Sequence, residues 1–314
     1  MRVLIAEKSH AKYAELIKAT LSSGSPRLEL VASDDLQGLP ALAADCHVWL
    51  GQPDLLAGLL RKGLKPQWLQ STWAGIKPLL ADDLPRDYLL SRAVGIFGQV
   101  MAEYVLCHML AHERQISAQQ AAQQAQHWRG VLPHSLAGRR VLIVGCGDIG
   151  HSVALFLAAF GVELLGVASQ AREQGPFIEV ASISDLPRMA ARADYLINLL
   201  PDTPATQDIY NSELFALLKP SAMFINAGRG AAVVDEDLVS ALQADKLAAA
   251  VIDVCRVEPL PAGHMFWTGP RLLLTGHSSA PTQPALMAKL FVSNLERFQA
   301  GQRLQGFVDF SRDY

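Results

Sequence analysis

Short apolar runs alternate with helix-like patterns along the first third of the chain. Such runs, bounded by polar or turn residues, are typical of buried strands, whereas apolar residues at the helical period over residues 10–21 predict an amphipathic helix. The predicted strands are residues 2–6, 28–31, 47–50, 68–70 and 88–91. Alternation of strands with helices favours a parallel α/β sheet.

A second series of the same kind begins at Arg140. Between the two series, from residue 98 to about residue 126, the pattern predicts one long helix. Its apolar side consists of Ala102, Val105, Leu106, Met109 and Leu110. The second series predicts strands at 141–144, 164–167, 195–199, 222–226, 249–254 and 272–274, with helices at 149–160 and 284–297.

Together these elements predict an α/β protein with two Rossmann-like domains, each a doubly wound parallel sheet. We expect residues 1–98 plus 283–314 to form one domain and residues 99–282 to form a second domain inserted into it. The length of 314 residues agrees with two domains, because single hydrophobic cores rarely grow beyond roughly 250–300 residues.

Composition narrows the class of protein. Hydrophobic residues make up 50% of the chain and charged residues 18%, so a large buried core is expected. The formal net charge of −3, without Lys/Arg blocks, argues against nucleic acid as a partner. No run reaches the ~18 apolar residues of a membrane span. The four cysteines are scattered without Cys-x-x-Cys spacing, so we expect reduced thiols in a cytoplasmic protein and no metal site.

A Gly-x-Gly-x-x-Gly motif directly follows one predicted strand and opens a helix. Gly145 would allow the tight turn, Gly147 would let a pyrophosphate approach the backbone, and Gly150 would let the helix pack closely on the strand. With Asp148 and Ile149 at the helix start, this turn predicts a dinucleotide site. The alternative is a turn with a purely structural role.

The end of the next predicted strand bears on the choice of dinucleotide. An acidic residue here would bind the ribose diol of NAD, but residues 164–172 contain neither Asp nor Glu. Ser169 and Arg172 are instead suited to a 2′-phosphate, which favours NADP(H), with NAD(H) as the alternative. Arg172 is otherwise an ordinary solvated surface charge.

Three chemically active side chains follow three later predicted strands. Residues just beyond the carboxyl ends of parallel strands converge on the ligand crevice of a doubly wound sheet, so Arg229, Glu258 and His277 are expected to meet beside the cofactor. An arginine offers a planar fork of donors for a carboxylate. A histidine transfers protons near neutral pH, and a carboxylate on its second nitrogen fixes its tautomer. Singly, each has a plainer explanation as a surface charge, a loop residue or a hydrogen-bonded histidine.

Taken together, these segments resemble the D-isomer-specific 2-hydroxyacid dehydrogenases. The matching motifs are residues 144–150, 199–201, 217–220, 225–230, 253–261 and 275–280. Residues 70–76 (QSTWAGI) and 95–103 (GIFGQVMAE) are most similar to the glyoxylate/hydroxypyruvate reductase A branch of this family. The resemblance implies transfer of a hydride between NAD(P)H and a small 2-keto acid, giving the D-2-hydroxy acid.

The resemblance also implies roles for individual residues. Arg229 would bind the substrate carboxylate and polarise the keto oxygen, His277 would be the acid/base, and Glu258 its partner. The substrate would also be bound by the loop of Trp73, Ala74, Gly75 and Ile76. The implied cofactor contacts, besides the glycine turn, Ser169 and Arg172, are Leu200, Pro201, Ala227, Gly228, Arg229, Asp253 and Ser279.

Relatives in this family are dimers, so a homodimer is expected. Trp128 resembles a residue that reaches the partner's active site, and a packing role for it is the alternative. The bulk of Trp73, Phe97 and Trp267 suggests a tight pocket for two- or three-carbon acids.

Two positions depart from the family pattern. Gly276 stands where the family usually has proline before the catalytic histidine, and Cys255-Arg256 stands where it often has Phe-Glu. Glu258 argues against a formate-type dehydrogenase. The alternative from another class is a dinucleotide-sensing regulator or co-repressor on the same scaffold, because a fold does not fix a function.

Overall fold

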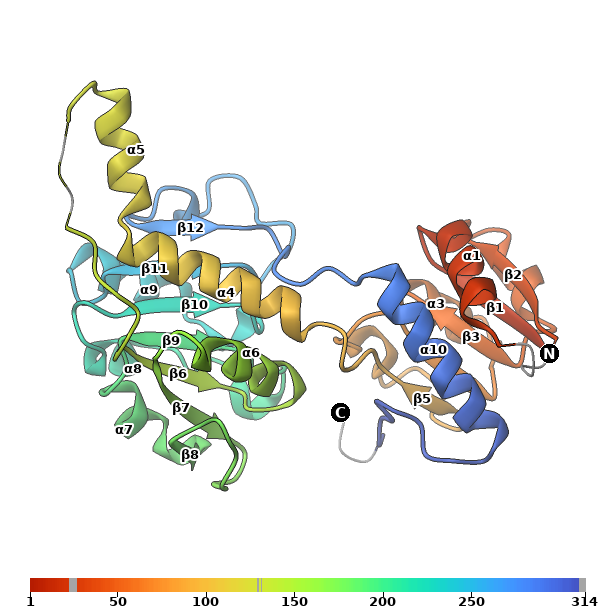
Figure 1. The fold of residues 1–314 in the computed structure, drawn as a ribbon. Coiled ribbons are helices and arrows are strands. Elements are labelled where there is room, and N and C mark those ends of the chain that lie inside the picture. The colour runs from red at the N-terminus through yellow and green to blue at the C-terminus, as the bar shows by residue number, and fades with distance from the viewer. Residues whose placement is uncertain (23–26, 129, 131, 311–314) are drawn as a thin grey trace. The chain divides into compact units, whose positions relative to one another are not determined.

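The computed structural model describes residues 1–22, 27–128, 130 and 132–310 (Figure 1). The chain divides into two compact units: unit 1 comprises Met1–Ile96 and Thr282–Tyr314, and unit 2 comprises Phe97–Pro281. Unit 2 is therefore continuous in sequence and lies between the two segments that build unit 1.

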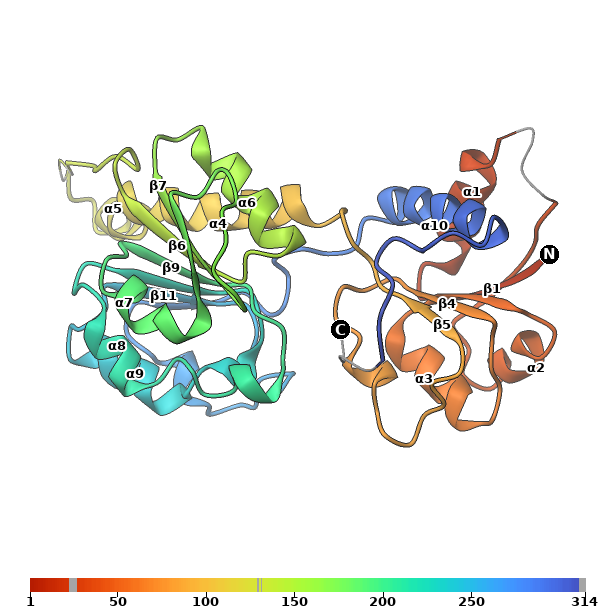
Figure 2. The ribbon, with the colours of Figure 1, turned by 90° about the horizontal axis from the view of Figure 1, so that it is seen from below.

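Unit 1 is a three-layer α/β structure around a five-stranded parallel sheet in the order β2-β1-β3-β4-β5. Helices α1 and α10 cover one face of the sheet, and α2 and α3 cover the other (Figure 2). The strands are β1 (Arg2–Ala6), β2 (Glu29–Ser33), β3 (Val48–Gly51), β4 (Trp68–Ser71) and β5 (Leu89–Ser91). The helices are α1 (His10–Thr20), α2 (Leu39–Ala43), α3 (Pro53–Arg61), the 3-10 helix η1 (Lys77–Leu79) and α10 (Pro284–Gln299).

The far end of the chain completes the core of unit 1. Trp68 of β4 is fully buried and stacks on Phe291 of α10, with ring centroids 5.3 Å apart. On the opposite face, Trp49 and Leu69 pack in a cluster with Leu56 of α3. Successive strand residues point to opposite faces, so covering both faces explains why apolar residues occupy adjacent positions in these strands.

Unit 2 contains a seven-stranded parallel sheet in the order β12-β11-β10-β9-β6-β7-β8. The strand order reverses between β6 and β9, and ligands of doubly wound sheets bind at the carboxyl ends of the strands at such a switch point. The strands are β6 (Arg140–Val144), β7 (Glu163–Ala168), β8 (Glu179–Ser182), β9 (Tyr195–Asn198), β10 (Met223–Asn226), β11 (Ala249–Ile252) and β12 (Leu272–Leu274).

Helices cover both faces of this second sheet (Figure 2). Val141 and Ile143 of β6 pack towards α4 and α6, whereas Leu142 and Val144 pack towards α7, α8 and α9. The helices are α4 (Gly98–Glu113), α5 (Ile116–Gln124), α6 (Asp148–Ala158), α7 (Leu186–Ala190), α8 (Ser212–Leu217) and α9 (Asp235–Gln243). The described part of unit 2 also contains the 3-10 helices η2 (Ile183–Asp185), η3 (Pro204–Thr206), η4 (Gly230–Ala232) and η5 (Met265–Trp267). The prediction of two parallel α/β sheets is confirmed.

The long helix predicted over residues 98–126 is wrong in one respect, because it is two helices. Gln115 adopts a left-handed backbone with φ 50° between α4 and α5. The carboxylate of Glu113, at the end of α4, is buried against Tyr195 and Arg139, and its backbone carbonyl accepts from His134 N. These contacts tie the end of α4 to the sheet, whereas α5 has no buried residue.

Two smaller features also differ from expectation. Strand β8 was not predicted, because it is a short edge strand without an apolar run. The apolar side of α4 is narrower than predicted: Ala102, Val105 and Met109 are buried, but Leu110 is 37% exposed. Within the described part of the chain, no helix is both long and apolar enough to cross a membrane.

Candidate active site

The glycine turn occupies the switch point of the unit 2 sheet, between the end of β6 and the start of α6. Gly145 has φ 109°, a conformation that favours glycine, and a Cβ there would lie 2.8 Å from the Leu199 backbone. A Cβ on Gly150 would lie 2.0 Å from the Gly145 carbonyl oxygen, so the helix packs too closely for any side chain. Both glycines are therefore required by the protein's own packing.

Gly147 is different, because no atom of the protein needs it to be glycine. A Cβ built there would meet nothing within 4 Å, and its φ of −78° suits any residue. Gly147 is the N-cap of α6, where backbone N–H groups and the helix dipole favour a bound anion. The glycine thus leaves space for a group outside the protein.

Arg172 lies next to this turn. Its Nη2 donates to the carbonyl of Cys146 at 2.8 Å, and its Nε donates to Gln174 at 2.8 Å. The carbonyl contact ties the side chain to the glycine turn rather than leaving it solvated. Ser169 is exposed just beyond the end of β7.

Two buried asparagines shape the turns after β9 and β10. Asn198 Nδ2 donates to Asn226 Oδ1 at 2.8 Å, and the same Asn226 oxygen accepts from Gly228 N. Asn198 Oδ1 accepts from Leu200 N, and Asn226 Nδ2 donates to the Arg229 carbonyl. The pair therefore fixes the backbone of both turns at the carboxyl edge of the sheet.

Arg229 follows β10 at this edge. Its Nη1 donates to the Gly228 carbonyl at 2.6 Å. Burial lowers the pKa of the guanidinium from its usual value, and the carboxylates of Asp202 and Glu258 oppose that shift. An arginine remains charged under such a shift, and a partly desolvated cation attracts an anion more strongly than a solvated one.

His277 and Glu258 form the expected pair. His277 Nδ1 lies 2.7 Å from Glu258 Oε2, and Glu258 Oε1 accepts from Cys255 N at 2.8 Å. Glu258 is therefore held by the backbone after β11 while it holds the imidazole after β12. Both side chains are partly exposed to solvent.

Asp253 organises the loop that carries His277. Its carboxylate is buried and accepts from Thr275 Oγ1 at 2.6 Å, Ser278 N at 2.8 Å and Ser279 N at 3.1 Å. Its backbone carbonyl accepts from His277 N. The loop residues 276 and 277 both have positive φ, and these bonds hold them in that conformation.

The predicted substrate loop lies in unit 1, directly after β4. Trp73 is 40% exposed, whereas Ile76 is buried. Ser71 Oγ contacts both Trp73 N and Trp73 O at 3.1 Å, which holds the start of the loop. The other two bulky residues suggested as a pocket with Trp73 are in different surroundings. Phe97 is buried as the N-cap of α4, whereas Trp267 is 57% exposed.

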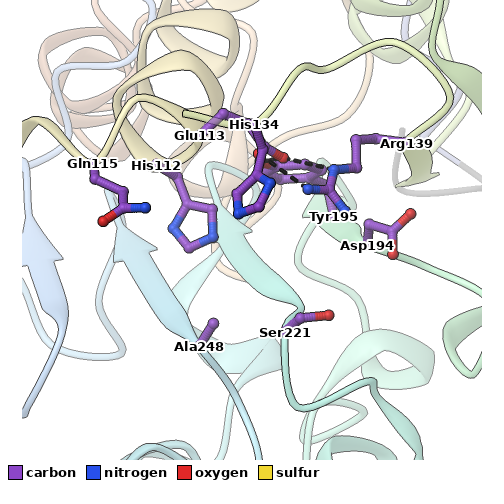
Figure 3. A pocket seen from close by; sticks show the side chains of 9 residues that line it. All are labelled: His112, Glu113, Gln115, His134, Arg139, Asp194, Tyr195, Ser221 and Ala248. Atoms are coloured by element: carbon purple, nitrogen blue, oxygen red, sulfur yellow. Dashed lines mark hydrogen bonds and ion pairs between the residues drawn. The ribbon is translucent and has the colours of Figure 1, made fainter. Parts of the chain in front are cut away.

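A cavity of about 270 Å³ lies at the amino ends of the unit 2 strands, opposite the glycine turn (Figure 3). Arg139, Asp194, Ser221 and Ala248 line it, and each precedes a strand, so it opens at the amino ends of the strands. Figure 3 shows Arg139 and Tyr195 directed at the Glu113 carboxylate beside it. The switch point is at the opposite edge, so this cavity is not part of the candidate active site.

Comparison with known proteins agrees with this geometry. The sequence model "D-isomer specific 2-hydroxyacid dehydrogenase, NAD binding domain" matches residues 106–279. The chain belongs to this family. A glyoxylate/hydroxypyruvate reductase A of Serratia proteamaculans is 40% identical over 220 residues, 69% of each chain. Another, from Yersinia enterocolitica, is 32% identical over 290 residues, 92% of this chain and 85% of the relative.

Solved structures of the D-2-hydroxyacid dehydrogenases match nearly the whole chain. A family protein from Aeromonas salmonicida has a TM-score of 0.92 at 37% identity and covers 98% of this chain and 99% of its own. An NADPH-dependent glyoxylate/hydroxypyruvate reductase from Sinorhizobium meliloti, in complex with NADP and sulfate, has a TM-score of 0.83 at 28% identity. That match covers 100% of this chain and 99% of the relative.

The structure explains both departures from the dehydrogenase pattern. Gly276 has φ 65°, a conformation that proline cannot adopt, so this position of the histidine loop excludes proline. Arg256 is bonded to Asp208 and to the carbonyl of Val233, so its charge is already paired. Burial, followed by nearby carboxylates including Glu258, raises the pKa of the Cys255 thiol to about 11, which keeps that side chain neutral.

Several residues that support this dehydrogenase site were not predicted from the sequence. They are Asn198 and Asn226, and Tyr104, whose hydroxyl lies 2.8 Å from Thr275 Oγ1. The available signal was an uncharged polar residue at the end of each of two apolar strands, since fully buried amides need partners. Tyr104 gave no such signal, because its contact joins distant parts of the sequence. In the described residues, no cluster of three or more His, Cys, Asp or Glu could hold a metal ion.

Proposed function

We propose that the protein is an NADPH-dependent reductase of small 2-keto acids of the glyoxylate and hydroxypyruvate type, giving the D-2-hydroxy acid. The observation that carries the proposal is the contact of 2.7 Å between His277 Nδ1 and Glu258 Oε2. This pair lies at the carboxyl ends of the unit 2 strands, as do Arg229 and the glycine turn. A regulatory binding protein would need the dinucleotide turn but not this proton-transfer pair. The names of the reductases that it resembles support the same activity.

The residues at the switch point fit a dinucleotide. The open space at Gly147 and the N-terminus of α6 suit a pyrophosphate, and Arg172 suits a 2′-phosphate. Leu200, Ala227 and Gly228 lie on the two turns fixed by the asparagine pair. When bound, the cofactor supplies a hydride from its nicotinamide ring.

In this proposal the chain's own groups orient the acid and supply a proton. Arg229 binds the carboxylate and stabilises negative charge that develops on the keto oxygen. Because Glu258 occupies His277 Nδ1, the Nε2 nitrogen is left to give a proton to that oxygen. Glu258 also stabilises the protonated imidazole before the transfer. The loop of Trp73, Ala74, Gly75 and Ile76 would add backbone contacts to the carboxylate.

The decisive assay follows oxidation of NADPH or NADH with glyoxylate and hydroxypyruvate. We expect turnover with NADPH at a lower KM than with NADH. Arg172→Ala should raise the KM for NADPH about ten-fold or more and leave that for NADH unchanged, because charge-assisted bonds contribute about 1.5–3 kcal/mol. Equal effects on both cofactors would refute the phosphate role, and no turnover with a broad panel of keto acids would refute the enzyme.

A second prediction concerns Gly147, which has open space around it, and Gly150, which packs against backbone. Gly147→Ala should fold normally but raise the KM for NADPH, since overpacking costs about 1–3 kcal/mol and only the cofactor fills that space. Gly150→Ala should lower the melting temperature, because its Cβ meets the Gly145 backbone. Thermal melts and cofactor titrations test both. Gly58→Ala, on α3 with open space around it, is the control. Normal NADPH affinity in Gly147→Ala would contradict the proposed site.

We also propose a cytoplasmic homodimer. All four cysteines are free, which agrees with a reducing compartment. Trp128 is 99% and Leu132 87% exposed after α5, and Leu155, Phe156 and Phe160 form an exposed apolar face on and beside α6. Apolar surface of this extent supports contact with a second copy. Light scattering on the purified protein measures the assembly, and a monomer at all concentrations would refute it.

A further inference from the structure

Three polar side chains meet where three neighbouring strands of unit 1 end. Glu7 follows β1, Gln52 follows β3 and Thr72 follows β4. The Glu7 carboxylate is only 6% exposed, and it accepts from Thr72 Oγ1 at 2.7 Å, from Lys8 N at 3.0 Å and from Gln52 Nε2. Glu7 therefore bridges elements that are far apart in sequence.

The backbone brings these side chains together. Gln52 N donates to the Ala6 carbonyl and Thr72 N donates to the Gly51 carbonyl, both at 2.9 Å, so the strand ladder continues one residue past each strand. A Cβ on Gly51 would lie 2.1 Å from the Ala6 oxygen, so only glycine permits this close approach. The backbone at the carboxyl ends of these strands therefore holds the three side chains in contact.

Glu7 is a costly residue to bury at this position. Among the ion pairs of the described residues, none joins Glu7 to a Lys, Arg or His, and a buried carboxylate without a cation depends on its hydrogen bonds. One of those bonds comes from Thr72, which is fully buried and whose carbonyl also accepts from Thr282 Oγ1 at 2.9 Å. Thr72 is therefore held from two sides, immediately before Trp73 begins the loop.

We propose that Glu7 is a positioning residue for keto-acid binding: through Thr72 it sets the backbone of residues 73–76. This inference rests on the proposed function, in which that loop binds the substrate carboxylate. Glu7 acts at a distance, since its own oxygens are occupied by protein donors. Its effect should fall on substrate affinity rather than on proton or hydride transfer, whose residues belong to unit 2.

Kinetics of Glu7→Gln test the proposal first. An amide has one acceptor oxygen in place of two, so it cannot accept from Thr72, Gln52 and Lys8 together. We expect the KM for glyoxylate to rise about ten-fold, as for loss of a hydrogen bond to a charged group, with kcat and the KM for NADPH unchanged. Thr72→Val should reproduce this effect, whereas Thr72→Ser, which keeps the hydroxyl, should not.

A swapped pair and a matched control separate this role from general stability. The double variant Glu7→Gln with Gln52→Glu restores one carboxylate and one amide in contact, and it should recover much of the lost affinity. Asp34→Asn removes an exposed carboxylate after the adjacent strand β2 and should change nothing. A lower melting temperature with an unchanged KM in Glu7→Gln would show a purely structural role and overturn the proposal.

A second readout does not depend on catalysis. The chain has five tryptophans, so 5-fluorotryptophan labelling gives five ¹⁹F signals, and Trp73→Phe identifies that of Trp73. In Glu7→Gln the Trp73 signal should shift or broaden while the signals of buried Trp49 and Trp68 stay in place. An unchanged Trp73 signal overturns the positioning role. A perturbed signal in a protein that turns over no keto acid would refute the proposed function alone.

Discussion

Replacement of His277 is expected to lower kcat by about 10²- to 10⁴-fold, the usual contribution of positioned acid–base catalysis. His277 has φ 56°, so alanine would be strained there, and His277→Asn is the better variant because asparagine tolerates this conformation. It cannot transfer the proton, yet it should leave the loop and cofactor binding intact. Turnover is measured with saturating NADPH and glyoxylate.

His134→Ala provides the matched control for this experiment. His134 is an exposed histidine of the same unit, beside the cavity at the opposite sheet edge, and its loss should leave kcat unchanged. Near-normal turnover in His277→Asn, with folding preserved, would show that another group supplies the proton.

The second large effect is expected for Arg229→Lys. The charge is kept, but a single ammonium cannot present two parallel donors to a carboxylate and reach the keto oxygen as well. We expect kcat/KM to fall about 10²- to 10³-fold, the cost of removing one preorganised donor to a developing oxyanion. Steady-state kinetics with glyoxylate at fixed NADPH give this ratio.

Arg140→Lys is a suitable comparison, since Arg140 forms an exposed pair with Glu163 at the amino end of β6. Exposed pairs of this kind contribute little, so activity and stability should be nearly those of the parent. If Arg229→Lys behaved like this control, the arginine would have no part in binding the acid.

The α/β fold could be predicted because its strands are buried on both faces. Residues 141–144 and 195–197 are continuous apolar runs, and the glycine motif marked the switch point between them. No comparable marker stands at Gln115, where a left-handed residue divides α4 from α5. That break depends on Glu113 bonding to Tyr195 and Arg139, contacts between residues distant in sequence.

For the candidate site, the residues that directly follow strands could be predicted, but those that hold the loops could not. Arg229, Glu258 and His277 were predicted because each follows a strand, and the structure pairs the last two. The roles of Asp253 and of the two asparagines in holding the loops were not found, because hydrogen bonds between turns leave no periodic pattern in a sequence. Ser169 and Arg172 were inferred from a missing acid, and the bond from Arg172 to the glycine turn supports that choice.

The insertion of unit 2 within unit 1 has a consequence for biosynthesis. As the chain leaves the ribosome, the strands of the first sheet emerge before unit 2, but α10, which covers Trp68, emerges after it. Unit 2 is contiguous and can fold during translation, while the part of the first sheet that α10 covers stays exposed until α10 has been made. Folding of unit 1 therefore waits for synthesis of a segment on the far side of unit 2, and does not finish with its own strands.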